Sequence, residues 1–242
     1  MSHAGDEFAG PAKQLSGWLI PLTVFLVTAA LSALFLIYYL APLPPELIAE
    51  QPAPTDSTAP VALSVGGTVF HIPSSYIVFA SARHGGPRES LDMVVLLPDL
   101  QGYSLELAQE FASNAPDSRV VNVTVREDAR TLTEQEKLRR IYMPQVETNT
   151  TGPAPVGLTL YNFRADSGYR DEELYVGDTG EGLILLRCTK QSFDVPSPSC
   201  LVDMALNSEL SITYRFKRTH LERWHEVDSG IRALVGAFMD KS

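Results

Sequence analysis

The stretch that decides the architecture is GWLIPLTVFLVTAALSALFLIYYLA, residues 17–41, which carries no charged side chain. A helix needs about 20 apolar residues to cross a hydrocarbon core of about 30 Å. Trp18 stands at one end of the stretch, and Tyr38 and Tyr39 stand near the other. Aromatic rings with a polar edge favour the two membrane interfaces. The sequence therefore predicts a transmembrane helix over residues 17–41 with these three rings at the membrane surfaces.

Two other interpretations of this stretch are a buried core helix and a cleaved signal peptide. A core helix would show a polar stripe, whereas only Thr23, Thr28 and Ser32 interrupt the apolar residues. A signal peptide would have a basic start and a shorter apolar centre, but Asp6 and Glu7 precede this one. We therefore expect an uncleaved signal-anchor.

The placement of Lys and Arg predicts the orientation. Lys13 lies before the helix, and no Lys or Arg follows it until Arg83. Because positive charge is retained on the cytoplasmic side, residues 1–16 are expected to be a short cytoplasmic tail. The chain is then a single-pass protein of the cytoplasmic (inner) membrane, and its larger part lies in the periplasm or a similar exterior space.

Small residues four apart on this helix leave a homodimer open as an alternative. Thr28 and Ser32 form one such pair, and Ala29 and Ala33 form another. Small residues at this spacing let two helix backbones approach closely, but the pattern is weak.

Residues 42–60 and 61–242 are predicted to be a linker and one exterior domain. The linker contains six prolines, which remove backbone N–H donors and favour an extended spacer. In the domain, the sequence predicts an α+β fold with a mainly antiparallel sheet. Apolar and alternating runs predict strands at 61–65, 68–72, 91–97, 120–126, 158–163, 173–176, 183–188, 201–206 and 210–216. Gly66-Gly67 predicts a tight hairpin between the first two strands.

Helices are expected after capping residues at 105–112, from 133 to 142, and at the C-terminal end. The C-terminal helix should begin at a capping box formed by Thr219 and Glu222. It carries one apolar stripe that should pack on the sheet, made of Leu221, Trp224, Val227, Ile231, Leu234, Val235 and Phe238.

Cys188 and Cys200 are the only cysteines, and they flank a predicted loop, Thr189–Ser199. Two cysteines in an oxidising compartment are expected to form a disulfide. Such a bond would fix the loop, and loops held by a scaffold often carry recognition. This loop and the Gly-containing segment Ser81–Ser90 are therefore candidate recognition loops.

Composition excludes several classes of function. The chain has 19 Lys and Arg against 29 Asp and Glu, a net charge of −10, which argues against nucleic-acid binding. No known catalytic motif occurs, and His220 and His225 are five apart on a helix, so they do not predict a metal site. The acidic turns between Asp166 and Glu181 do not match the spacing of a calcium-binding loop. We expect neither a cofactor nor a metal, and the sequence identifies no catalytic residue.

The sequence therefore favours a membrane-anchored, non-enzymatic interaction or scaffold module of the bacterial cell envelope, with a protein as partner. One alternative is an envelope enzyme that uses carboxylates such as Asp92, Asp99 or Asp171 for acid–base chemistry. Another is a sensor domain that binds a small ligand or a metal ion.

Overall fold

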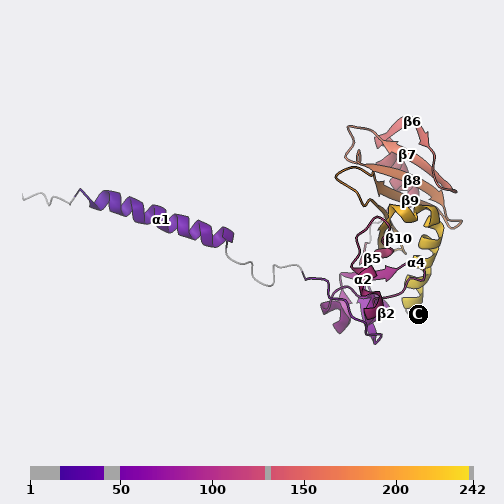
Figure 1. The fold of residues 1–242 in the computed structure, drawn as a ribbon, viewed down its shortest axis with the longest axis horizontal. Helices are drawn as coiled ribbons and strands as arrows, with labels where there is room; N and C mark the ends of the chain where they lie inside the picture. The colour runs from indigo at the N-terminus through magenta and orange to yellow at the C-terminus, as the bar shows by residue number, and fades with distance from the viewer. Residues whose placement is uncertain (1–16, 41–49, 129–131, 240–242) are drawn as a thin grey trace, which may run out of the picture. The chain divides into compact units, whose positions relative to one another are not determined.

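The computed structural model describes residues 17–40, 50–128 and 132–239. Contacts divide the chain into two units, Met1–Glu50 and Gln51–Ser242. Figure 1 shows the helix of the first unit and the mixed helix and sheet structure of the second.

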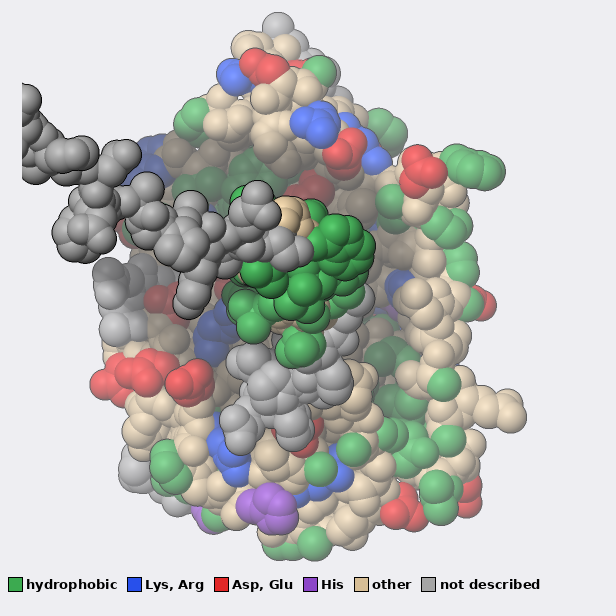
Figure 2. Space-filling model, turned by 90° about the vertical axis from the view of Figure 1, so that its left-hand side faces the viewer, with side chains coloured by type: hydrophobic (Ala, Val, Ile, Leu, Met, Phe, Trp, Pro, Cys, Tyr) green, Lys and Arg blue, Asp and Glu red, His purple; other side chains and the backbone are tan. Residues whose placement is uncertain are grey.

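In the described part of the first unit, residues 17–40 and 50, the structure has one helix, α1 (Leu19–Leu40), of 22 residues. At about 1.5 Å per residue it is about 33 Å long, enough to cross a bilayer core. The segment Leu19–Tyr39 has a mean hydropathy of 2.4, and none of it is buried. In Figure 2 the helix is seen nearly end-on, and the side chains that it shows are mainly hydrophobic. The absence of burial removes the core-helix interpretation and leaves a membrane anchor or a signal sequence. The structure gives no support to pairing of two copies through this helix.

The second unit is built on an antiparallel sheet of eight strands in the order β4-β5-β11-β10-β9-β8-β7-β6. The strands are β4 (Ser90–Leu96), β5 (Val120–Glu127), β6 (Val146–Gly152), β7 (Leu158–Phe163), β8 (Glu172–Asp178), β9 (Leu183–Thr189), β10 (Ser199–Ala205) and β11 (Leu210–Lys217). Much of this order can be followed in Figure 1, from β6 to β10. The predicted α+β fold with a mainly antiparallel sheet is confirmed.

A smaller sheet of three strands has the order β2-β1-β3. Its strands are β1 (Pro60–Val65), β2 (Thr68–Pro73) and β3 (Gly86–Arg88), and β3 runs parallel to β1. The β1–β2 hairpin turns at Gly66 and Gly67, whose φ angles of 52° and 80° suit glycine because it has no Cβ. The segment Ser81–Ser90 contains the short helix Ser81–His84 and strand β3, so most of it is ordered structure rather than an open loop.

The main core lies between one face of the large sheet, the small sheet and the C-terminal helix α4 (Trp224–Phe238). Alternate residues of each strand face this core, as Leu91, Met93 and Val95 do in β4. The predicted apolar stripe of α4 supplies the opposite side, with Ile231 and Val235 completely buried. The packing of a C-terminal amphipathic helix on the sheet is therefore confirmed.

The opposite side of the large sheet is called the outer face here. Over β7, β8 and β9 it is covered by α3 (Glu134–Lys137) and a π-helical turn (Leu138–Tyr142), which enclose a second apolar cluster around Phe163 and Leu174. Four other short helical segments are Ser74–Tyr76, Leu105–Leu107, α2 (Ala108–Phe111) and Met143–Gln145. The sheet therefore has helical structure against both faces.

The start of α4 differs from the prediction. The segment Arg218–Arg223 is a 3₁₀ helix, and α4 begins at Trp224 without a side-chain cap. The Thr219 hydroxyl donates a hydrogen bond to the Pro116 carbonyl at 2.5 Å instead of capping the helix. A tertiary contact has replaced the local capping box.

The compact unit begins at Gln51, ten residues before the boundary at 61 that the sequence suggested. The Ala53 N–H donates to the Val78 carbonyl at 3.1 Å, and the Arg83 guanidinium bonds the Ala53 carbonyl. The Ser74 N–H and hydroxyl both bond the Ala59 carbonyl. The second half of the Pro-rich segment is thus held on the domain, and residues 42–49 lie outside the described residues.

Candidate functional site

The cysteine loop is fixed at both ends. Cys188 and Cys200 are directly opposite on β9 and β10, and their sulfur atoms are 2.02 Å apart. The Ser197 hydroxyl donates to the Asn114 carbonyl at 2.9 Å, which ties the loop to the segment after α2. At the loop tip, Phe193 lies in a turn closed by Ser192 and Val195 and is 99% exposed. The loop therefore presents one large apolar side chain on a constrained backbone.

Beside this loop the outer face is hollowed by two adjoining cavities of about 490 and 370 Å³. They share four lining residues, Ser113, Asn114, Val120 and Asn122, so we treat them as one feature, the outer groove. The volume of each cavity falls in the range typical of ligand-binding clefts. The floor crosses three strands, because Val94 of β4 and Arg215 of β11 both pair with Asn122 of β5.

One end of the outer groove is apolar. Tyr103 and Phe111 stand on its wall with ring centroids 5.4 Å apart, and both are partly exposed. Pro52 and Pro54 form part of the rim, because the segment after Gln51 is held on the domain. The remaining apolar residues that line this end are Ile77, Val78, Val94, Ala108, Ala112 and Val120.

The other end of the outer groove is basic. Arg215 and Lys217 project from β11, and Ser197 and Ser199 of the cysteine loop lie beside them. The Lys217 ammonium donates to the Asn114 side-chain oxygen at 2.6 Å, a neutral partner. Partial burial, and secondarily the positive charge of Arg215, lower the pKa of Lys217. None of the residues that line the groove, all within the described part of the chain, carries a carboxylate.

No family model matches the chain, and no curated protein matches its sequence. Two solved structures share the fold. The first is Smlt3025, an immunity protein of the Stenotrophomonas maltophilia type IV secretion system, with a TM-score of 0.55 and 15% identity over 76% of this chain and 95% of that one. The second is the Neisseria meningitidis iron-regulated outer membrane lipoprotein FrpD, with a TM-score of 0.51 and 15% identity over 79% of this chain and 98% of that one. At this identity the likeness concerns the fold alone.

The three carboxylates considered for acid–base chemistry lie in separate places. Asp92 is on β4, where its oxygens accept hydrogen bonds from Ser90 at 3.0 Å and Thr124 at 2.7 Å. Asp99 is in the turn after β4, and Asp171 precedes β8, 3.6 Å from Arg170. The structure therefore does not bring them together as an acid–base pair.

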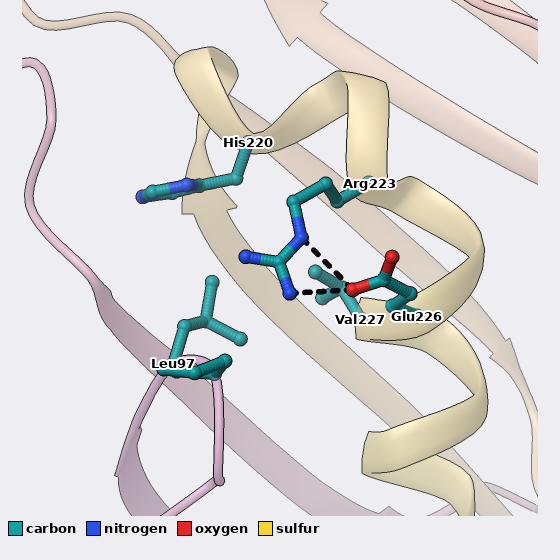
Figure 3. Close-up of a pocket in the computed structure, with 6 residues that line it drawn as sticks. Leu97, His220, Arg223, Glu226 and Val227 are labelled. Atoms are coloured by element: carbon teal, nitrogen blue, oxygen red, sulfur yellow. Dashed lines mark hydrogen bonds and ion pairs between the residues drawn. The ribbon is translucent and has the colours of Figure 1, made fainter.

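The histidines and acidic turns also stay apart. Among the residues that the structure describes, no three His, Cys, Asp or Glu side chains form a group that could hold a metal ion. The His220 ring contacts the Ser118 carbonyl at 3.0 Å, whereas His225 packs edge-on against Trp224. Figure 3 shows His220 beside Arg223, which is bonded to Glu226 at 2.5 Å. The pocket at this place measures about 20 Å³, room for about one water molecule.

Two polar networks, the first buried and the second partly buried, stabilise the unit. The Tyr214 hydroxyl donates to the Asp228 carboxylate at 2.6 Å, and the Arg232 guanidinium holds the same carboxylate at 2.9 Å. Asp228 is 2% exposed, so these bonds replace its lost hydration. Burial, reinforced by the charge of Asp228, raises the pKa of Tyr214 well above its ordinary value. Because every partner is satisfied within the core, we assign this network a structural role.

A second network joins Tyr175, Glu173 and Arg218. The Tyr175 hydroxyl donates to Glu173 at 2.9 Å and accepts from Arg218 at 2.8 Å. Burial and then the negative charge of Glu173 raise the pKa of Tyr175 to about 12. Arg218 also bonds the Thr189 carbonyl at 3.2 Å, so this network supports the base of the cysteine loop.

The outer groove was not predicted from the sequence. Its residues come from segments between Pro52 and Lys217 that have no common motif. Of the groove residues, only Ser197 and Ser199 belong to a segment that the sequence predicted to carry recognition. One sequence pattern could have indicated the basic end of the groove. Side chains alternate along β11, which places Arg215 and Lys217 on the face opposite Tyr214 and Phe216.

Proposed function

We propose that this chain is a membrane-anchored module of the bacterial cell envelope that binds a protein partner and is not an enzyme. The observation that carries the proposal is the fold, which is shared with an outer membrane lipoprotein and with an immunity protein of a secretion system. The likeness to an immunity protein of a secretion system supports a protein as the partner of this chain. The dispersed carboxylates offer no specific support for an enzyme.

The proposed topology has residues 1–16 in the cytoplasm, 17–41 in the cytoplasmic membrane, and the compact unit in the periplasm. Lys13 before the apolar helix supports this orientation, since positive charge stays on the cytoplasmic side. The paired Cys188 and Cys200 support an oxidising compartment, where disulfides form and persist. Trp18, Tyr38 and Tyr39 are proposed to lie at the two interfaces. Residues 42–49 then form the remaining spacer.

In-cell crosslinking of the full chain, followed by purification in detergent and mass spectrometry, tests the proposal. We expect one protein to be crosslinked repeatedly to side chains of the unit Gln51–Ser242. A variant with Trp224→Ala provides the control, because loss of a buried aromatic ring costs about 3–5 kcal/mol and should destabilise the folded unit that binds the partner. Recovery of the chain alone would contradict a specific partner. Equal capture of a protein by the wild type and by Trp224→Ala would contradict it as well.

A further inference from the structure

We propose that the outer groove binds an extended segment of the protein partner that carries an apolar side chain and, further along, a carboxylate. The inference rests on the proposed function, because it names the chemistry of the partner at one surface of the module. It follows from three features of the groove: its apolar end, its basic end and the distance between them.

The apolar end gives an anchoring position for a side chain. Tyr103 and Phe111 are half-buried rings on the wall, and Val94 of β4 is part of the floor. Aromatic residues in a concave apolar surface are typical of positions where a partner side chain is desolvated. Because Pro52 and Pro54 close the rim, this end is a recess rather than a flat patch. An aliphatic or aromatic side chain of the partner is therefore the group that suits this apolar recess.

The basic end selects a carboxylate. Arg215 is exposed on the floor, and the hydrogen bonds of Lys217 go to neutral oxygens of Asn114 and Ser197. Two cations without a carboxylate in the lining stand out in a chain with a net charge of −10. A guanidinium binds a carboxylate through two parallel hydrogen bonds, which gives direction as well as charge. An acidic side chain of the partner is therefore the complementary group.

The sheet sets the spacing between the two groups. Val94 and Arg215 lie two strands apart in one cross-strand row, through their common neighbour Asn122. With neighbouring strands about 4.8 Å apart, this row is about 10 Å long. An extended chain advances about 3.3 Å per residue, so the apolar and acidic residues of the partner should be about three positions apart. A segment lying across the strands meets both ends of the groove.

The test places a photoreactive amino acid at Asn122, which is exposed on the floor, in the full chain in living cells. Arg215→Glu is compared with Arg126→Glu, a matched control with the same change of charge. Arg126 is also exposed on the outer face, but it lies four residues from Asn122 along β5, about 13 Å away and outside the groove lining. A third variant, Ala112→Trp, fills the apolar end from an exposed position.

We expect Arg215→Glu and Ala112→Trp each to lower the crosslinking yield about tenfold or more, the usual effect of disrupting a central interface contact. Arg126→Glu should leave the yield within about twofold, because Arg126 lies outside the groove and isolated exposed charges contribute little. The crosslinked partner peptide should hold a carboxylate and an apolar residue at the stated spacing. Changing that carboxylate to Lys should restore crosslinking to Arg215→Glu. The melting temperatures of the three variants should equal that of the wild type, which would show that the substitutions leave folding unchanged.

The outcomes separate this inference from the proposed function. Capture of the partner from Val69 on the opposite side of the unit, but not from Asn122, would overturn the groove and leave the function standing. Equal losses for Arg215→Glu and Arg126→Glu would show a general charge effect and also overturn it. A crosslinked lipid or nucleic acid in place of a peptide would exclude the stated occupant. Failure of capture at every position would overturn both proposals.

Discussion

Removal of the disulfide should destabilise the compact unit by about 3 kcal/mol. Cys188 and Cys200 are 12 residues apart, and closing a loop of this length in the unfolded chain costs about that much in the chain-entropy estimate. Both side chains are completely buried, so the double substitution Cys188→Ala/Cys200→Ala adds no exposed apolar surface. For a unit of this size, about 2–4 °C per kcal/mol gives a fall in melting temperature of about 6–12 °C.

Urea unfolding of the full chain in detergent, followed by the fluorescence of Trp224, measures the change. Wild type treated with a reductant should lose the same stability as the double variant, and the variant itself should not respond to the reductant. The cysteine loop supplies Ser197 and Ser199 to the outer groove, so partner crosslinking from Asn122 should fall as well. Unchanged unfolding midpoints in both the reduced wild type and the double variant would refute the reasoning.

Three further predictions concern single residues. Tyr214→Phe should cost about 1.5–3 kcal/mol in urea unfolding, because the buried Asp228 carboxylate loses a hydrogen-bond donor; a loss below about 0.5 kcal/mol would contradict this. The pKa of Tyr175 is raised to about 12, so its stabilisation is complete below about pH 10 and is lost as the pH rises from there through about 12. Because burial also raises the pKa of Tyr214, the late rise in tyrosinate absorbance should fall by one tyrosine's share in Tyr175→Phe rather than disappear. Phe193→Ala should leave the melting temperature unchanged, because the ring is 99% exposed, and a drop of several degrees would show an unrecognised contact.

Local patterns predicted much of the fold. The Gly66-Gly67 pair marked the β1–β2 hairpin, and the apolar spacing of α4 marked both its existence and its buried face. These features depend on residues a few positions apart, so a single sequence carries them. The short helix at Leu105–Leu107 was likewise indicated by Ser104, whose hydroxyl accepts from the Leu107 N–H.

Long-range contacts could not be predicted in the same way. β5 pairs with β11, and nothing in either strand specifies the other as its neighbour. The Thr219 capping box failed because the Thr219 hydroxyl finds the Pro116 carbonyl, about a hundred residues earlier. The outer groove depends on the same kind of contact, since the strand order brings Val94 and Arg215 to opposite sides of Asn122. The sequence indicated a scaffold and a constrained loop, but not the surface beside them.

The most direct test of the account is protease treatment of intact spheroplasts, combined with alkaline extraction of their membranes. The full chain should remain in the extracted membranes, because α1 is long and apolar enough to span them. Protease added from outside should release the unit Gln51–Ser242 from its anchor while a cytoplasmic marker stays intact. Recovery of the full chain in the soluble cytosolic fraction, or its complete protection until the membrane is broken, would contradict an anchored exterior module.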